Sequence, residues 1–217
     1  MSLREVLIDE LRDLYSAENQ LVKTMPKVAK QVSSQELKQA FVSHMEETKG
    51  QVERLKQIFE KLGKKPTGKH CKGMEGAIDE VKEALEEDEE DALKDAGIIG
   101  GAVRVEHYEI AGYTFAIAIA KQLGETEIAG LLQQTLTEEQ NAGKLILSTA
   151  KGVLKDASAQ EPDEKTVPEK KPKDSKEKQS ERESEQDERA AQGELKVDQS
   201  KSKSKKSGSK KNGGKKK

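Results

Sequence analysis

Bulky and cross-linking residues are scarce in this 217-residue sequence. It has no tryptophan, and aromatic residues make up only 3% of the chain, which excludes a large aromatic core. Its single cysteine, Cys71, cannot form an intrachain disulfide, as expected in a reducing compartment. No apolar stretch approaches the ~18 residues that a membrane-spanning helix needs, and the start, MSLREVLIDE, lacks the pattern of a secretory signal. We therefore expect a cytoplasmic protein without a membrane span.

Charged residues, in contrast, make up 37% of the chain and are unevenly distributed. The segment 156–217 has 18 Lys and Arg and 14 Asp and Glu, a net charge of +4, which leaves −6 for the remainder because the whole chain carries −2. This segment has almost nothing apolar to bury, so we predict a disordered tail. Its last part, 201–217, has nine lysines and no acid, and could bind DNA or another anionic surface. The alternative is a tail that only increases solubility.

Apolar residues recur at helical spacing through the rest of the sequence, and no strand periodicity is found. The long helices should be joined by two short links and one long link, 63–90. Two antiparallel pairs joined by one long crossover are typical of a ferritin-like four-helix bundle. We predict an all-α domain over 1–155, with long helices at 3–30, 35–62, 91–123 and 125–154 and a short helix at 74–85.

Specific residues mark where these helices should begin and end. Ser2 is a good N-cap for the first helix, and Ser33 with Glu36 has the spacing of a capping box at the second. Gly63 and Gly124 should end the second and third long helices, since glycine readily adopts the left-handed conformation found after a helix. The helix bounds therefore rest on capping chemistry as well as on periodicity.

Each long helix also has a glutamate on or beside its apolar face, close to its midpoint. Mid-helix positions of antiparallel helices meet at one level, so about five carboxylates should converge. Unpaired buried carboxylates cost several kcal/mol or take up a proton, and no basic residue other than Arg104 is expected at this level. Carboxylates with histidine suit iron or manganese. We predict a di-iron or di-manganese site formed by Glu18, His44, Glu47, Glu106, Glu109 and Glu139.

The residues leave several alternatives open. A single inner glutamate commonly reaches solvent at the helix boundary. Glu138 fits the apolar stripe of the last helix almost as well as Glu139. Glu106 and Glu109 are either both ligands or one supports the other, and His44 is either a ligand or a hydrogen-bonding neighbour of the ligands. If no metal binds, the carboxylates are protonated or hydrogen-bonded, and the chain is a structural or interaction protein.

Five stretches form a specific set over residues 3–153: DELRDLYSAENQL, HMEETKGQVERLKQIFEKLG, CKGMEGAIDE, RVEHYEIAGY and LTEEQ. This set resembles the YciF/YciE family of bacterial ferritin-like stress proteins. The resemblance implies a ferritin-like four-helix fold with accessory helices, a dimer, and expression under stress. The activity of that family is poorly defined. A di-metal carboxylate site in this chain would react with peroxide or dioxygen and so remove peroxide or iron during stress.

Wider relatives such as rubrerythrins and bacterioferritins have Glu on the first and third helices and Glu-x-x-His on the second and fourth. The glutamates of this chain are similar to that pattern, but the histidines are not. Gly50 and Ala142 stand where His is expected, and on the second helix His44 precedes Glu47 instead. The resemblance therefore implies a site richer in oxygen than the standard di-iron centre.

Overall fold

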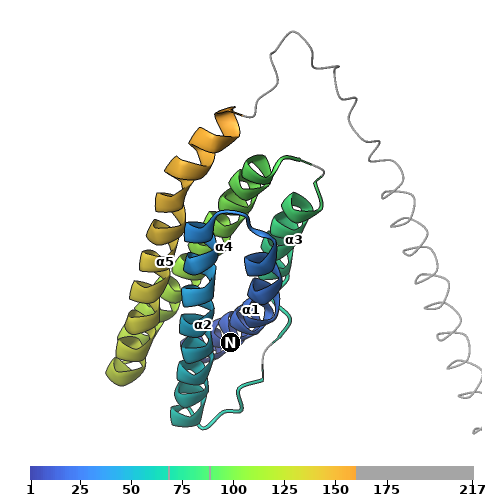
Figure 1. The fold of residues 1–217 in the computed structure, drawn as a ribbon. Coiled ribbons are helices and arrows are strands. Elements are labelled where there is room, and N and C mark those ends of the chain that lie inside the picture. Colours follow the sequence, from blue (N-terminus) through green and yellow to red (C-terminus); the bar gives the residue numbers. More distant parts are fainter. Residues whose placement is uncertain (68, 88, 160–217) are drawn as a thin grey trace, which may run out of the picture. The chain divides into compact units, whose positions relative to one another are not determined.

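Four long helices and one short helix make up the computed structural model, which describes residues 1–67, 69–87 and 89–159 (Figure 1). No strand occurs in these ranges, so the all-α prediction is confirmed. The bounds agree with the predicted helices within two residues, except that the last helix runs past Leu154. The helices are α1 (Leu3–Gln31), α2 (Gln35–Lys61), α3 (Lys72–Glu86), α4 (Asp91–Gln122) and α5 (Thr126–Ala159).

The last helix crosses the boundary that the sequence suggested between bundle and tail. Residues 156–159 still belong to α5, with Ala157 buried. The predictions of a disordered tail and of DNA binding by the lysines of 201–217 otherwise concern residues outside the described ranges.

The helices are connected as a ferritin-like bundle. Short links join α1 to α2 and α4 to α5, and the link from α2 to α4 is long and contains α3. In Figure 1, α3 lies outside the four long helices, where it packs on α1 and α4. Within the described chain, the predicted crossover with its short helix is therefore confirmed.

Two apolar clusters fill the bundle, and a polar layer separates them along every long helix. One cluster contains Leu11 of α1 and Phe59 of α2, and the other contains Met25 of α1 and Phe41 of α2. On α4 and α5 the two clusters likewise occupy opposite ends. Between them, each long helix contributes buried polar side chains near its midpoint. The apolar clusters thus hold these polar side chains at one depth, away from both ends of the bundle.

Most of the expected helix ends are formed as predicted. Ser2 caps α1 in a capping box, in which its hydroxyl accepts from the backbone N–H of Glu5 and the Glu5 carboxylate accepts from the Ser2 N–H. Gly63 and Gly124 follow α2 and α4 with φ angles of +61° and +74°. Side chains at these two positions would be strained, which explains the choice of glycine.

The predicted capping box of Ser33 and Glu36 is wrong. The cap of α2 is Ser34, whose hydroxyl accepts from the Leu37 N–H at 3.3 Å. The shift results from Asp95 of α4, which is 2% exposed and accepts from the N–H groups of Ser33 and Ser34, at 2.7 Å for Ser34. Asp95 thus anchors the turn between α1 and α2 to the start of α4.

Replacing Asp95 by alanine should lower the free energy of unfolding by about 2–3 kcal/mol, since two backbone donors lose a charged acceptor. Urea unfolding at pH 7 would measure this loss. The matched control is Glu90→Ala, because Glu90 is exposed and makes no side-chain cap bond. It should change stability by less than about 0.5 kcal/mol. Equal effects of the two substitutions would contradict the anchoring role.

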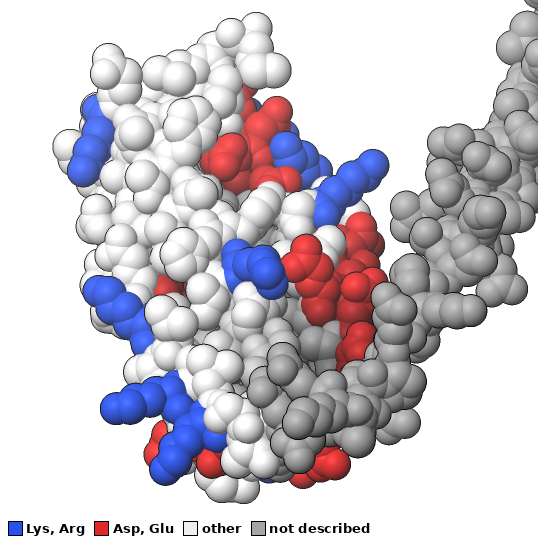
Figure 2. Space-filling view, turned by 90° about the horizontal axis from the view of Figure 1, so that it is seen from above, with Lys and Arg blue, Asp and Glu red and all other residues white. Residues whose placement is uncertain are grey.

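The surface of the described residues is divided by charge. Figure 2 shows acidic side chains gathered on the side of α3, and few charges on the side of α5. The acidic residues on α3 include the exposed Glu75, Asp79, Glu80, Glu83 and Glu86. Large apolar residues are exposed elsewhere, at Val42, Phe115, Leu145, Leu147 and Leu154. No helix among the described residues has the length and apolar character needed to cross a membrane.

Candidate metal centre

The polar layer contains an unusual concentration of buried carboxylates. Glu18 of α1, Glu109 of α4 and Glu139 of α5 are each 0% exposed, and Glu106 of α4 is 2% exposed. His44 of α2, 4% exposed, faces the same layer. These side chains interrupt the row of buried apolar residues on each long helix, and the interruptions coincide in depth.

Four of these residues lie close enough to share an ion. One ligand atom each of His44, Glu106, Glu109 and Glu139 lies within 4.8 Å of the others. The Nε2 atom of His44 is 3.2 Å from Oε1 of Glu106 and 3.7 Å from Oε2 of Glu139. Oxygen ligands lie about 2.0–2.6 Å from a divalent cation, so opposite ligands are about 4–5 Å apart. The spacing therefore suits metal coordination.

Several polar atoms of the layer lack hydrogen-bond partners, and this shows whether the residues fit a metal. Both carboxylate oxygens of Glu109 and Glu139 are buried without a hydrogen-bond partner among the described residues, as is one oxygen each of Glu18 and Glu106. Orphaned buried acceptors are rare and costly in native proteins. A hard cation would satisfy all of them, and a set of oxygens with one imidazole is suited to iron or manganese.

Burial also makes the layer retain protons when no metal is bound. It raises the pKa of Glu18 to about 8, despite a hydrogen bond that favours the ionised form. Burial and the neighbouring carboxylates hold the pKa values of Glu109 and Glu139 well above their usual range. For His44, burial alone would lower the pKa, but the contacts with Glu106 and Glu47 raise it well above its ordinary value. A cation would replace these protons.

Glu18 has a fixed orientation in the layer. The hydroxyl of Tyr113, a fully buried residue of α4, donates to Oε1 of Glu18 and leaves Oε2 unpartnered. Glu18 lies outside the tightest group of four, but its charge raises the pKa values of Glu109 and Glu139. Tyr113 is thus a core residue that presents its hydroxyl to the layer.

Glu47 is the predicted ligand that the structure does not bring into the layer. Its side chain is 45% exposed, and its Oε2 lies 3.6 Å from Nδ1 of His44, on the opposite side of the imidazole from Glu106. A carboxylate at the outer nitrogen of a histidine orients the ring and increases the basicity of the inner nitrogen. This placement suits orientation of His44 better than coordination.

Replacing Glu47 by alanine should weaken manganese binding by about tenfold, because the His44 ring loses its outer partner. Isothermal titration calorimetry of the two proteins would measure the change. Glu46→Ala is the matched control, since the exposed Glu46 pairs with Lys49 and not with His44. A loss of affinity as large as that of Glu139→Ala would instead make Glu47 a direct ligand.

The structure distinguishes Glu139 from its neighbour Glu138. Arg54 of α2 donates two hydrogen bonds of 2.9 Å to the Glu138 carboxylate, and Gln51 donates a third at 3.2 Å. Glu138 is therefore engaged by α2 at the edge of the layer, and Glu139 is the residue of α5 that faces the other carboxylates.

The expectation that only Arg104 is basic at this level is wrong. Arg54 lies close enough for its charge to lower the pKa of Glu18, whereas Arg104 is at the surface, 3.5 Å from Glu80. Periodicity missed Arg54 because a long charged side chain beside an apolar stripe can extend its charged group to partners on another helix. Arg54 pairs with Glu138, so it does not neutralise the unpartnered carboxylates.

The fold and the layer define a class: a ferritin-like helical bundle with a buried carboxylate–histidine cluster at its centre. Comparison with known proteins identifies the family. The chain belongs to the family described as Domain of unknown function (DUF892), which matches residues 2–159. The resemblance seen in the sequence motifs is therefore confirmed.

Individual relatives cover the helical part of the chain. Over 139 residues it is 43% identical to Protein YciF of Escherichia coli, a match that covers 64% of this chain and 84% of YciF. The crystal structure of the E. coli stress protein YciF has a TM-score of 0.69 at 39% identity, and covers 71% of this chain and 98% of that one. YcfI from Rhodopseudomonas palustris has a TM-score of 0.66 at 41% identity, covering 67% and 93%.

Proposed function

We propose that this protein binds a pair of iron or manganese ions in the polar layer and uses them to handle peroxide, dioxygen or iron under oxidative stress. The observation that carries the proposal is the set of buried carboxylate oxygens without hydrogen-bond partners. In this proposal Glu47 orients the His44 ring and is not a metal ligand. The proposed ligands are Glu18, His44, Glu106, Glu109 and Glu139.

When bound, two such divalent ions can each supply one electron to an oxidant such as peroxide. The chain's own residues prepare the site for this. Glu18, Glu109 and Glu139 have raised pKa values, so binding releases their protons and affinity falls as the pH is lowered. The apolar clusters on both sides exclude water, which strengthens the interaction of the carboxylates with a cation. The relative named a stress protein supports the physiological setting.

The test is the metal content of the full chain, expressed without an affinity tag and purified without chelators. We expect about two iron or manganese ions per chain, by analogy with two-metal carboxylate sites. Mass spectrometry of the digested protein would count them, before and after anaerobic loading with ferrous ions. Protein that contains neither metal and gains none on loading would contradict the proposal and favour a structural or interaction role.

We further propose that the protein acts as a cytoplasmic homodimer. Large exposed apolar side chains, among them Phe115 at 52% and Leu147 at 57%, support an interface between copies. Light scattering coupled to size exclusion would give the mass of the full chain. A dimer that dissociates in the double variant Phe115→Ser, Leu147→Ser supports this proposal, and a monomer at micromolar concentration contradicts it.

A further inference from the structure

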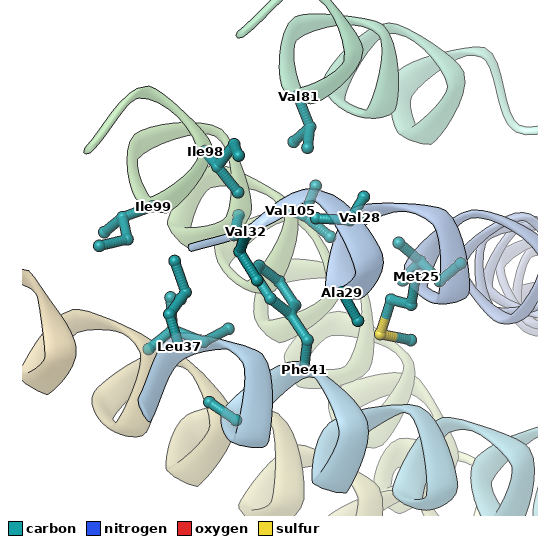
Figure 3. Packing of buried hydrophobic residues seen from close by; sticks show 14 of the residues in the cluster. Met25, Val28, Ala29, Val32, Leu37, Phe41, Val81, Ile98, Ile99 and Val105 are labelled. Carbon is teal, nitrogen blue, oxygen red and sulfur yellow. The ribbon is translucent and has the colours of Figure 1, made fainter. Parts of the chain in front are cut away.

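A small cavity lies next to the polar layer, on the side where α3 covers the bundle. Its volume is about 30 Å³, and it is lined by side chains of α1, α2, α3 and α4. Figure 3 shows Val81 of α3 pointing toward Val28 of α1 and Val105 of α4, which line this space. At its inner end are His44 and Glu106, two of the proposed ligands. The cavity therefore reaches the metal centre from the α3 side.

The walls of the cavity are almost entirely hydrocarbon. Apolar side chains line it from all four helices, including Leu21, Phe41, Ile78 and Ala102. Besides His44 and Glu106, the only polar lining residue is Thr24, which is also the only lining residue that is not buried. Thr24 is therefore the lining side chain that is most accessible to solvent.

The apolar lining determines which molecules can occupy the cavity. About 10–15 Å³ holds one water-sized molecule, so this space has room for one diatomic molecule, and apolar cavities stay dry and bind gases such as xenon. A cation or superoxide would lose its hydration with no compensating partner. Peroxide has two O–H donors, and the lining offers side-chain acceptors only at Thr24 and, at the inner end, at His44 and Glu106. Dioxygen has no hydrogen bonds to lose.

We propose that this cavity is a binding site for an uncharged apolar molecule of the size of dioxygen, held against the His44 and Glu106 edge of the layer. Binding itself depends only on the cavity. Its consequence, that dioxygen rather than peroxide is held beside the ions, rests on the proposed function. Metal ions would then enter the layer by another path.

Helix α3 forms one wall of the cavity, and its contacts with α1 and α4 hold that wall in place. The backbone N–H of Cys71, at the start of α3, donates to the Ser16 hydroxyl at 2.9 Å, and Gln20 donates to the Cys71 carbonyl at 3.1 Å. Along α4, a Cβ at Gly101 would approach a Val81 methyl to 2.7 Å, so glycine is needed for this close packing. These contacts hold Ile78 and Val81 over the cavity.

The experiment is methyl NMR of the metal-free full chain under dissolved dioxygen, which relaxes nearby methyl groups because it is paramagnetic. We expect several-fold larger relaxation enhancements at Ile78 and Val105 than at Leu7 and Ile128, which are buried in the other apolar cluster. Xenon, a diamagnetic probe, should shift the same lining methyls. Equal enhancements in the two clusters, with no xenon shifts at the lining, would overturn the proposal.

Two matched variants sharpen this result. Ala102→Val adds two methyl groups at the lining and should reduce the enhancement at Ile78 several-fold. Ala29→Val adds the same groups to the same apolar cluster, away from the lining, and should leave the enhancement unchanged. Equal behaviour of the two variants would contradict a defined site. If Ala102→Val does not fold, the xenon shifts of the unaltered protein decide alone.

Failure of this proposal differs from failure of the proposed function, because the gas measurements use metal-free protein. Selective relaxation in a protein that never binds metal would leave the cavity site intact and remove the metal function. Metal binding in a protein without selective relaxation would leave the metal function intact and remove the cavity site.

Discussion

Replacing Glu139 by glutamine should abolish the increase in melting temperature that ferrous or manganous ions give the full chain. At a metal concentration 100 times the Kd, binding adds about 2.7 kcal/mol of stability, which corresponds to about 5–10 °C for a domain of this size. Glutamine keeps the shape of Glu139 but removes the charge that a cation requires. Differential scanning calorimetry with and without metal would measure the shift.

The neighbouring residue supplies a close control. Glu138→Gln removes an acid from the same turn of α5, but Glu138 is paired with Arg54 at the edge of the layer. This variant should lose some stability and keep the full metal-dependent shift. If both variants keep the shift, the layer does not bind metal. If only Glu138→Gln loses it, the assignment of the α5 ligand is reversed.

The stability of the metal-free protein should fall by about 5–10 °C in melting temperature between pH 5.5 and pH 8. Glu18 has a pKa of about 8 in the folded protein and an ordinary value of 4.5, so between these values the folded state binds more protons than the unfolded state. Stability must then decrease as the pH rises. The raised pKa of His44 acts in the same direction, since its stabilising charge is lost on deprotonation.

A second variant links this pH dependence to the layer. Glu109→Gln replaces a buried carboxyl whose two oxygens lack partners with a neutral group of the same shape. It should raise the melting temperature of the metal-free protein at pH 8, change it little at pH 5.5, and weaken metal binding. The exposed Glu83→Gln should do none of these. A metal-free protein that becomes more stable as the pH rises would refute this account of the layer.

The sequence was sufficient for the helices and for the depth of the layer, because both depend on periodicity along single segments. Leu7, Leu11 and Leu14 repeat with helical spacing, and so do the buried residues on the other helices. The glutamates interrupt these stripes near mid-helix, and in an antiparallel bundle equal depth along the helix means proximity. Local pattern and tertiary position therefore coincide.

Details that depend on a partner distant in sequence could not be predicted in this way. Glu138 and Glu139 are adjacent and fit the stripe almost equally well, and they are distinguished by contacts with another helix, where Arg54 pairs with Glu138. Likewise, the residue that shifts the cap of α2 from Ser33 to Ser34 is Asp95, which follows Ser34 by 61 residues in the sequence. Single-helix periodicity contains no information about such contacts.

Glu47 shows the same limitation on the outer side of a helix. Its spacing from His44 placed it near the layer, and it does contact that histidine. Glu106 and Glu109 have the same three-residue spacing on α4 and are both buried. Spacing along one helix therefore could not show that the Glu47 carboxylate is half exposed, because its position depends on the helices packed around α2.

The most direct test of the central claim is anomalous X-ray scattering from crystals of the full chain loaded with manganese or ferrous ions. We predict anomalous peaks within the layer, at coordination distance from carboxylate oxygens of Glu106, Glu109 and Glu139. Crystals that contain metal elsewhere on the surface, with these carboxylates hydrogen-bonded to one another and no peak between them, would contradict the claim.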